Sequence, residues 1–139
     1  MHIRKNRFRH LPNLRISGGG ELLIEENEME CCCSALTATD LAQYWFESGR
    51  IRRLVFRRNR MKDCNALGGS AFVRVTVSGF GDAEAPKIHD SVELSDNLFS
   101  GVTHSAIRVA GVRNLILRGN RTDGANGLRM LIDGTETTL

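Results

Sequence analysis

The sequence predicts an all-β protein, a right-handed parallel β-helix of about five coils with two loop insertions at one corner. Three observations support this fold class: a repeated segment centred on asparagine, apolar residues that alternate around it, and a second short strand after each repeat. A recurring unit of about 22 residues is typical of solenoids, in which equivalent positions of neighbouring units stack on one another.

The repeated segment is six residues long. It has an apolar residue at the first position, asparagine at the fourth and an apolar residue at the sixth, and the other positions vary. In the final copy the sixth residue is Thr. It occurs as IRKNRF (3–8), IEENEM (24–29), FRRNRM (56–61), LSDNLF (94–99) and LRGNRT (117–122). Successive asparagines lie 21, 32, 38 and 23 residues apart. These separations indicate a short unit that is extended twice by an insertion.

Further apolar or small residues keep the same distance from each asparagine, which indicates strands with one buried face. The residues that lie two positions before the first residue of each repeated segment are Met1, Leu22, Leu54, Val92 and Leu115. Five residues after each asparagine they are Leu11, Cys32, Cys64, Val102 and Ala125. The second strands are expected at 13–17, 35–39, 72–78, 106–110 and 128–132.

The five asparagines themselves have a structural interpretation. Asparagine at the end of a strand tolerates left-handed backbone conformation and bonds to nearby backbone groups. In a stack of coils its amide can also bond to the equivalent amide of the next coil. We therefore expect Asn6, Asn27, Asn59, Asn97 and Asn120 to form a ladder.

Charges around these asparagines change sign from one repeat to the next. The residue two before the asparagine is Arg4, then Glu25, then Arg57. Opposite charges on neighbouring strands stabilise a sheet, whereas like charges repel. We therefore interpret the basic cluster FRRNRM as one layer of a charge ladder. With a net charge of only +3, this interpretation also disfavours a nucleic-acid partner.

The four cysteines lack the CxxC spacing of a zinc site, and no metal or other cofactor is expected. Cys32 and Cys64 occupy equivalent inward positions in adjacent repeats. As free thiols they would be small core residues, and stacking distance also permits a disulfide. The sequence leaves both alternatives open.

With 139 residues, the chain is long enough for one domain with a core, which we place at 1–139. No apolar run approaches the roughly 18–20 residues of a membrane span. Because Met1 already falls on an inward position and a solenoid needs capped ends, we expect a portion of a longer solenoid. Its open ends would pair with missing coils or with another copy.

Candidate binding residues lie in the two insertions, 40–51 and 79–90, which both follow a second strand. Loops on a rigid scaffold commonly carry function. Tyr44 and Trp45 are the sole Tyr and Trp of the chain, and an aromatic ring beside carboxylates suits the apolar face and the hydroxyls of a sugar. An oligosaccharide or polysaccharide is therefore the expected partner.

Glycoside hydrolysis needs two carboxyl groups. Asp40 closes the second strand before the first insertion, and Glu47 lies within that insertion, so these two are the predicted catalytic residues. Tyr44 and Trp45, with Asp82 and Glu84 of the second insertion, are the predicted substrate-binding residues. A solvated position for each acid is the alternative.

Three stretches carry a resemblance to a known family: YWFESGRIRRLVFRRNRMKDCN (44–65), KIHDSVELSDNLF (87–99) and VRNLILRGN (112–120). They resemble right-handed β-helix carbohydrate enzymes, most closely the α-1,3-galactosidase family of inverting glycoside hydrolases. The resemblance covers most of 22–122. It implies exo-cleavage of terminal α-galactose without a cofactor, and a secreted or periplasmic location for the full-length protein. The paired aspartates expected of that family are absent, since no Asp-Asp occurs in this chain.

Two other functions remain open on the same scaffold. One is a polysaccharide lyase or epimerase, which commonly uses Ca²⁺ held by carboxylates and a basic residue that abstracts a proton. The other is a non-catalytic structural or glycan-binding solenoid. Sugar-dependent fluorescence of Trp45, with and without Ca²⁺, would separate the three.

Overall fold

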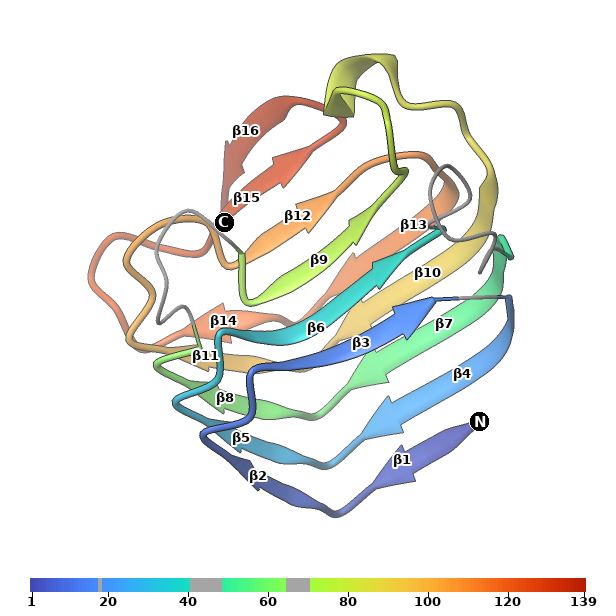
Figure 1. Ribbon diagram of the computed structural model, residues 1–139. Coiled ribbons are helices and arrows are strands. Elements are labelled where there is room, and N and C mark those ends of the chain that lie inside the picture. The colour runs from blue at the N-terminus through green and yellow to red at the C-terminus, as the bar shows by residue number, and fades with distance from the viewer. Residues whose placement is uncertain (18, 41–48, 65–70) are drawn as a thin grey trace.

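The computed structural model of the protein describes residues 1–17, 19–40, 49–64 and 71–139. This part of the chain is all-β, with parallel sheets and one short 3₁₀ turn, η1 (Asp82–Glu84), and without an α-helix. The strands fall into three sheets (Figure 1). Apolar side chains from all three form one buried core.

The first sheet contains β1 (His2–Arg4), β4 (Gly20–Glu25), β7 (Ile51–Arg57), β10 (His89–Ser95) and β13 (Val112–Arg118). The second sheet contains β2 (Arg7–Arg9), β5 (Glu28–Glu30), β8 (Arg60–Lys62), β11 (Leu98–Ser100) and β14 (Arg121–Thr122). The third sheet contains β3 (Asn13–Ser17), β6 (Ser34–Thr39), β9 (Val73–Thr76), β12 (Ile107–Val109), β15 (Arg129–Ile132) and β16 (Thr135–Thr138).

The chain visits the three sheets in rotation, so neighbouring strands in a sheet come from successive repeats. All described pairings are parallel except that of β15 with β16, which is antiparallel. The second strands expected from the sequence correspond to β3, β6, β9, β12 and β15. This topology is compatible with the parallel β-helix that the sequence predicts.

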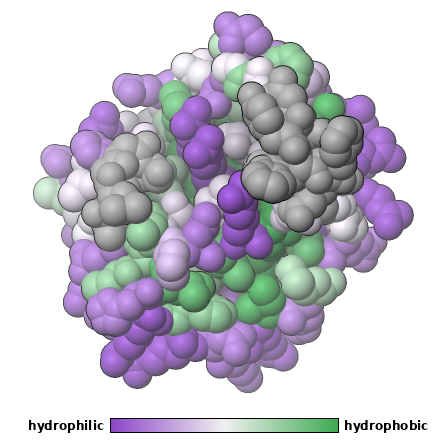
Figure 2. All heavy atoms as spheres, in the orientation of Figure 1, coloured by the Kyte–Doolittle hydropathy of each residue, from purple (hydrophilic) through white to green (hydrophobic). Residues whose placement is uncertain are grey.

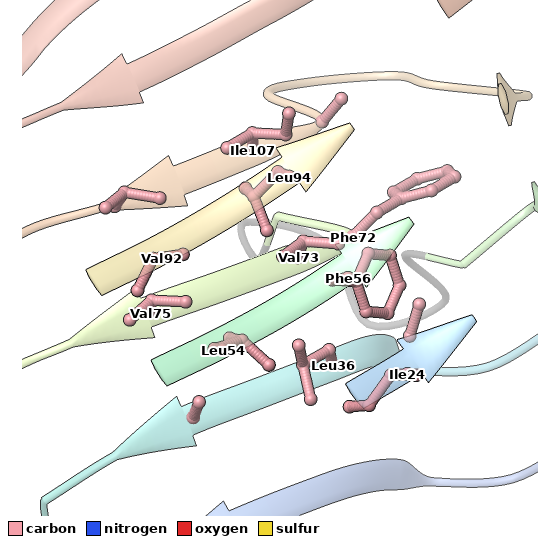
Figure 3. Close-up of a cluster of buried hydrophobic side chains, with 14 of the residues drawn as sticks. Ile24, Leu36, Leu54, Phe56, Phe72, Val73, Val75, Val92, Leu94 and Ile107 are labelled. Atoms are coloured by element: carbon pink, nitrogen blue, oxygen red, sulfur yellow. The ribbon is translucent and has the colours of Figure 1, made fainter. Parts of the chain in front are cut away.

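Register follows the sequence repeat. Ile24 pairs with Phe56, Phe56 with Leu94, and Leu94 with Leu117, so the apolar position before each asparagine stacks on its equivalents. Side chains of the first and third sheets point toward one another and fill the interior (Figure 3). A shift of one residue would turn these side chains to the outside, which fixes the register.

The prediction of inward positions is wrong at the two ends of the repeat set. Met1 is 63% exposed, and Ala125 is exposed in the turn after β14. At both positions the neighbouring layer that would cover the side chain is present on one side only. Partly buried apolar residues also occur at these ends, and hydrophobic side chains gather beside β1 to β4 on the face shown in Figure 2.

The asparagine ladder is confirmed. Each amide nitrogen donates to the next amide oxygen: Asn6 to Asn27 (3.2 Å), Asn27 to Asn59 (3.0 Å), Asn59 to Asn97 (3.2 Å) and Asn97 to Asn120 (2.9 Å). The same oxygens accept the backbone N–H of the preceding asparagine. Every asparagine in the middle of the ladder is thereby bonded on both sides.

The residue before each asparagine adopts the left-handed backbone conformation. The expectation that the asparagine itself adopts it is therefore wrong. The φ angles are 55° at Lys5, 57° at Glu26, 53° at Arg58, 54° at Asp96 and 62° at Gly119. This turn directs the following asparagine side chain inward, where the ladder forms.

The charge ladder is also confirmed. Arg57 Nε donates to Glu25 Oε2 at 2.8 Å, and Arg58 Nη2 lies 2.6 Å from the same oxygen. Arg4 Nε lies 3.2 Å from Glu26 Oε2 on the other side. The basic cluster therefore pairs with the preceding acidic repeat, as interpreted from the sequence.

Cys32 and Cys64 are buried free thiols, so the disulfide alternative is not adopted. Burial raises the pKa of the Cys64 thiol to about 12. Both cysteines act as small core residues in adjacent repeats.

Candidate functional site

Asp40, a predicted catalytic residue, follows β6 and is 8% exposed. Its Oδ1 accepts hydrogen bonds from the backbone N–H of Ser78 (2.7 Å) and from the Ser78 hydroxyl (3.0 Å). Ser78 follows β9, the next strand of the third sheet. The carboxylate therefore ties together the starts of the two predicted insertions.

Asp82 and Glu84, predicted to bind substrate, both lie in η1 within the second insertion. The carboxylate of Asp82 forms a two-point ion pair with Arg108 of β12, at 2.7 Å to Nε and 2.9 Å to Nη2. This bond raises the pKa of Arg108. Asp82 thus holds η1 against the outer face of the third sheet, while Glu84 is exposed.

Tyr44, Trp45 and Glu47 lie outside the described residues. The structure accordingly gives no distance between Asp40 and Glu47, and the assignment of catalytic and substrate-binding roles stays a prediction. Of the predicted site residues, Asp40, Asp82 and Glu84 are described. Asp40 and Asp82 are each bonded to another part of the chain.

His89 fixes the far end of the second insertion from inside the protein. It is fully buried at the start of β10. Nδ1 lies 3.2 Å from the backbone N of Ile51, and Nε2 lies 3.1 Å from the backbone O of Thr76. Because Nδ1 must accept and Nε2 must donate, the imidazole is neutral with its proton on Nε2. His89 therefore links β7, β9 and β10.

A groove of about 390 Å³ lies on the outer face of the first sheet. Its lining residues come from β1, β4, β7 and β10, with Met1 beside β1: Met1, His2, Glu21, Leu22, Leu23, Arg53, Val55, Arg57 and Glu93. Leu23 and Val55 pair in register and form an apolar floor. Charged side chains stand on both sides of it.

The charged side chains of this groove differ in whether they bond to other side chains of the protein. On one side, Arg57 bonds to Glu25, which is 3% exposed, and this hydrogen bond lowers the pKa of Glu25. Nearby, Glu93 accepts a 2.7 Å hydrogen bond from the Ser95 hydroxyl. On the other side, exposed Arg53 has no hydrogen-bond or ion-pair partner among the described residues and is available to a ligand.

A groove with an apolar floor and polar groups at its edges has the chemical character of a small-molecule site. It suits a sugar, because pyranose rings present C–H groups on one face and hydroxyl groups around the rim. This groove is not predicted from the sequence, because its lining residues come from separate repeats. Aligning the repeats one residue before the inward positions would have placed Leu23, Val55 and Glu93 side by side.

A second groove, of about 330 Å³, lies along β5, β8 and β11 of the second sheet. Its acidic and basic residues largely pair with each other across the strands: Arg7 with Glu28 at 3.4 Å and Lys62 with Glu30 at 3.9 Å. With its charges satisfied internally, this groove offers fewer free groups to a ligand than the first.

Within the described ranges, no group of three or more His, Cys, Asp or Glu is placed to hold a metal ion. The same ranges contain no helix that is long and apolar enough to cross a membrane.

Comparison with known proteins gives one distant similarity. No protein-family model matches the chain, and no solved structure gives a significant match. Over 90 residues the chain is 26% identical to α-1,3-galactosidase A from two strains of Bacteroides fragilis. The matched region covers 63% of this chain and 15% of each relative. The chain therefore has partial, distant similarity to an α-1,3-galactosidase and spans a small part of that protein's length.

Proposed function

We propose that this chain is part of a right-handed parallel β-helix within a larger glycoside hydrolase that acts on terminal α-galactosides. The rotation of the chain through three parallel sheets supports the β-helix, and parallel crossover connections are almost always right-handed. The similarity to α-1,3-galactosidase A supports the activity and is the observation that carries the proposal.

The groove on the first sheet is the proposed saccharide site. Leu23 and Val55 would contact the apolar face of a sugar ring, and Arg53 and Glu93 would bond to its hydroxyls. The first insertion, 40–51, ends at the start of β7, which carries Arg53. Tyr44 and Trp45 of the first insertion remain the proposed aromatic substrate-binding residues.

Asp40 and Glu47 remain the proposed acid pair. Asp40 Oδ1 accepts two hydrogen bonds from Ser78, and these hold the carboxyl group in place beside the first insertion. Asp40 is the proposed acid of the pair.

Binding can be tested by titrating methyl α-galactoside while observing the fluorescence of Trp45, the sole tryptophan. We expect Arg53→Ala to weaken binding about tenfold, as loss of a hydrogen bond from a charged donor predicts. Arg52→Ala is the matched control, because Arg52 is an exposed neighbour that does not line the groove. Isothermal titration calorimetry provides a readout that does not depend on Trp45.

Equal affinity in wild-type protein and Arg53→Ala would refute the groove assignment. Absence of galactoside binding in the wild-type chain would refute the proposed function of this portion and favour a structural solenoid. Hydrolysis of an α-1,3-linked galactose disaccharide tests the activity itself. Cleavage of polygalacturonate to an unsaturated product, dependent on Ca²⁺, would instead indicate a lyase.

A further inference from the structure

The outer face of the third sheet carries a row of residues whose charges do not alternate. Arg15 pairs in register with Thr37, Thr37 with Arg74, and Arg74 with Arg108. Strands in a sheet are about 4.8 Å apart, so Arg15 and Arg74 stand about 10 Å apart with the threonine between them. Hydrophilic side chains are visible over the middle of this sheet in Figure 2.

Unlike the first sheet, this row has no acidic residue between its arginines. There the corresponding pattern is Arg4, Glu25, Arg57, and the glutamate bonds to the arginine of the next strand. On the third sheet a neutral threonine hydroxyl stands where the first sheet has a carboxylate. Two guanidinium groups therefore flank a position without negative charge.

Arg74 is the least satisfied member of the row. It is half-buried, and its Nε is buried without a hydrogen-bond partner in the described part of the chain. Burial lowers the pKa of Arg74, and the neighbouring charge of Arg108 lowers it further. A buried donor without an acceptor is uncommon in folded proteins and calls for a physical explanation.

The nearby acid Asp82 does not provide that acceptor. Both of its carboxylate oxygens bond to Arg108, at 2.7 and 2.9 Å. Arg15, on the other side of Thr37, is exposed and has no ion-pair partner among the described residues. The row therefore combines two unpaired guanidinium groups with one hydroxyl that can donate a hydrogen bond.

We infer that Arg15, Thr37 and Arg74 bind the carboxylate of an acidic sugar, such as a uronic acid residue. Arg74 Nε itself is closed to solvent, so the carboxylate would bond to the terminal guanidinium nitrogens of Arg74 and Arg15. The Thr37 hydroxyl can donate a further hydrogen bond. The bound carboxylate occupies the position that Glu25 occupies on the first sheet. This inference rests on the proposed saccharide function and adds a subsite separate from the groove.

The test is an NMR titration that observes the Arg74 Nε–H signal while galacturonate, galactose, sulfate or phosphate is added to the whole chain. We expect galacturonate to shift this signal, and galactose to leave it unchanged. Arg74→Gln is expected to lower galacturonate affinity about tenfold. Arg121→Gln, which removes an exposed arginine from β14 of the second sheet, is the matched control and retains full affinity.

A second variant keeps the inference testable if Arg74→Gln folds poorly. Thr37→Glu supplies the missing carboxylate from within the chain and completes an alternating row. We expect it to raise the melting temperature and to abolish the response to galacturonate. A lower melting temperature, or an unchanged response, would contradict the inference.

The outcomes separate this inference from the proposed function. Galactoside binding that depends on Arg53, together with an Arg74 signal unaffected by galacturonate, refutes the subsite alone. A shift with sulfate or phosphate but not with galacturonate refutes the assignment to an acidic sugar. Failure of both galactoside and galacturonate to bind refutes the saccharide function and this inference together.

Discussion

Asn59 lies in the middle of the asparagine ladder and bonds to the neighbouring layers on both sides. Its amide nitrogen donates to the Ile24 carbonyl and to Asn97, and its oxygen accepts from Asn27. We expect Asn59→Ala to lower the free energy of unfolding by about 2–4 kcal/mol, because it leaves buried donors of Asn27 without an acceptor. Urea denaturation measures this loss.

Asn6 provides the control for this prediction. It lies at the exposed end of the same ladder and bonds to one neighbouring asparagine. Asn6→Ala is expected to cost about 1 kcal/mol or less. Equal losses in the two variants would show that the ladder is not a buried network.

Glu25 makes stability depend on pH. The hydrogen bond from Arg57 is the largest cause that lowers its folded-state pKa below the ordinary value of 4.5. A lowered carboxylate pKa stabilises the fold above the unfolded-state value, and this contribution is lost as pH falls through the folded-state value. We therefore expect stability to decrease on acidification below about pH 4.5.

In Glu25→Gln this acid-dependent loss should be smaller, and stability at neutral pH should already be lower. Urea midpoints measured between neutral pH and about pH 3 provide the comparison. Glu136→Gln, at an exposed position of β16, should keep the wild-type pH dependence. A Glu25→Gln profile that parallels wild type would contradict the assignment.

The four cysteines should differ in reactivity toward alkylating reagents. Burial raises the pKa of Cys64 to about 12 and excludes the reagent, whereas Cys31 and Cys33 are partly exposed. The thiolate is the nucleophile. Iodoacetamide at about pH 8 should therefore label Cys31 and Cys33 and leave Cys64 unmodified until the protein unfolds, as peptide mass spectrometry can show.

At the scale of elements, His89 joins the ends of three strands that lie beside the insertion 79–90. His89→Ala removes the acceptor of the Ile51 N–H and leaves a cavity in the core. We expect a loss of about 3 kcal/mol and faster hydrogen exchange at the Ile51 amide. His104→Ala, at an exposed position, should change neither quantity.

At the scale of the whole molecule, one inward row runs from end to end of the second sheet. Phe8 pairs with Met29, Met29 with Met61, Met61 with Phe99, and Phe99 with Thr122. The middle three are buried, whereas Phe8 and Thr122 are partly exposed. Burial is therefore greatest at the centre of the stack and decreases toward both ends.

This gradient predicts unequal effects of the same substitution. Phe99→Ala removes a fully buried ring that also contacts Phe72, at a centroid distance of 6.0 Å, and should cost about 3–5 kcal/mol. Phe8→Ala, at the open end, should cost about 1–2 kcal/mol. If urea unfolding gave similar losses, the end of the stack would be covered by a partner in solution.

The sequence alone was enough to predict the stacking of the repeats. Residues at equivalent positions of successive repeats meet when the strands pair, so Asn27 bonds to Asn59 and Glu25 bonds to Arg57. The order and register of the sheets follow from this recurrence, because a shift of one residue would break the apolar, amide and charge rows together. The same alignment places Cys32 and Cys64 at equivalent inward positions, and the structure shows both as free thiols.

Only the tertiary structure decided which side chains meet across the outer faces and at the corner. Leu23, Val55 and Arg53 form a groove, Asp82 pairs with Arg108, and Arg74 keeps an unpaired nitrogen. Asp82 lies in an insertion and not in a repeated strand, so the repeat pattern does not mark its contact with Arg108. Their contacts depend on where η1 and Ser78 lie beside the sheets, which follows from packing in three dimensions and not from the period of the chain.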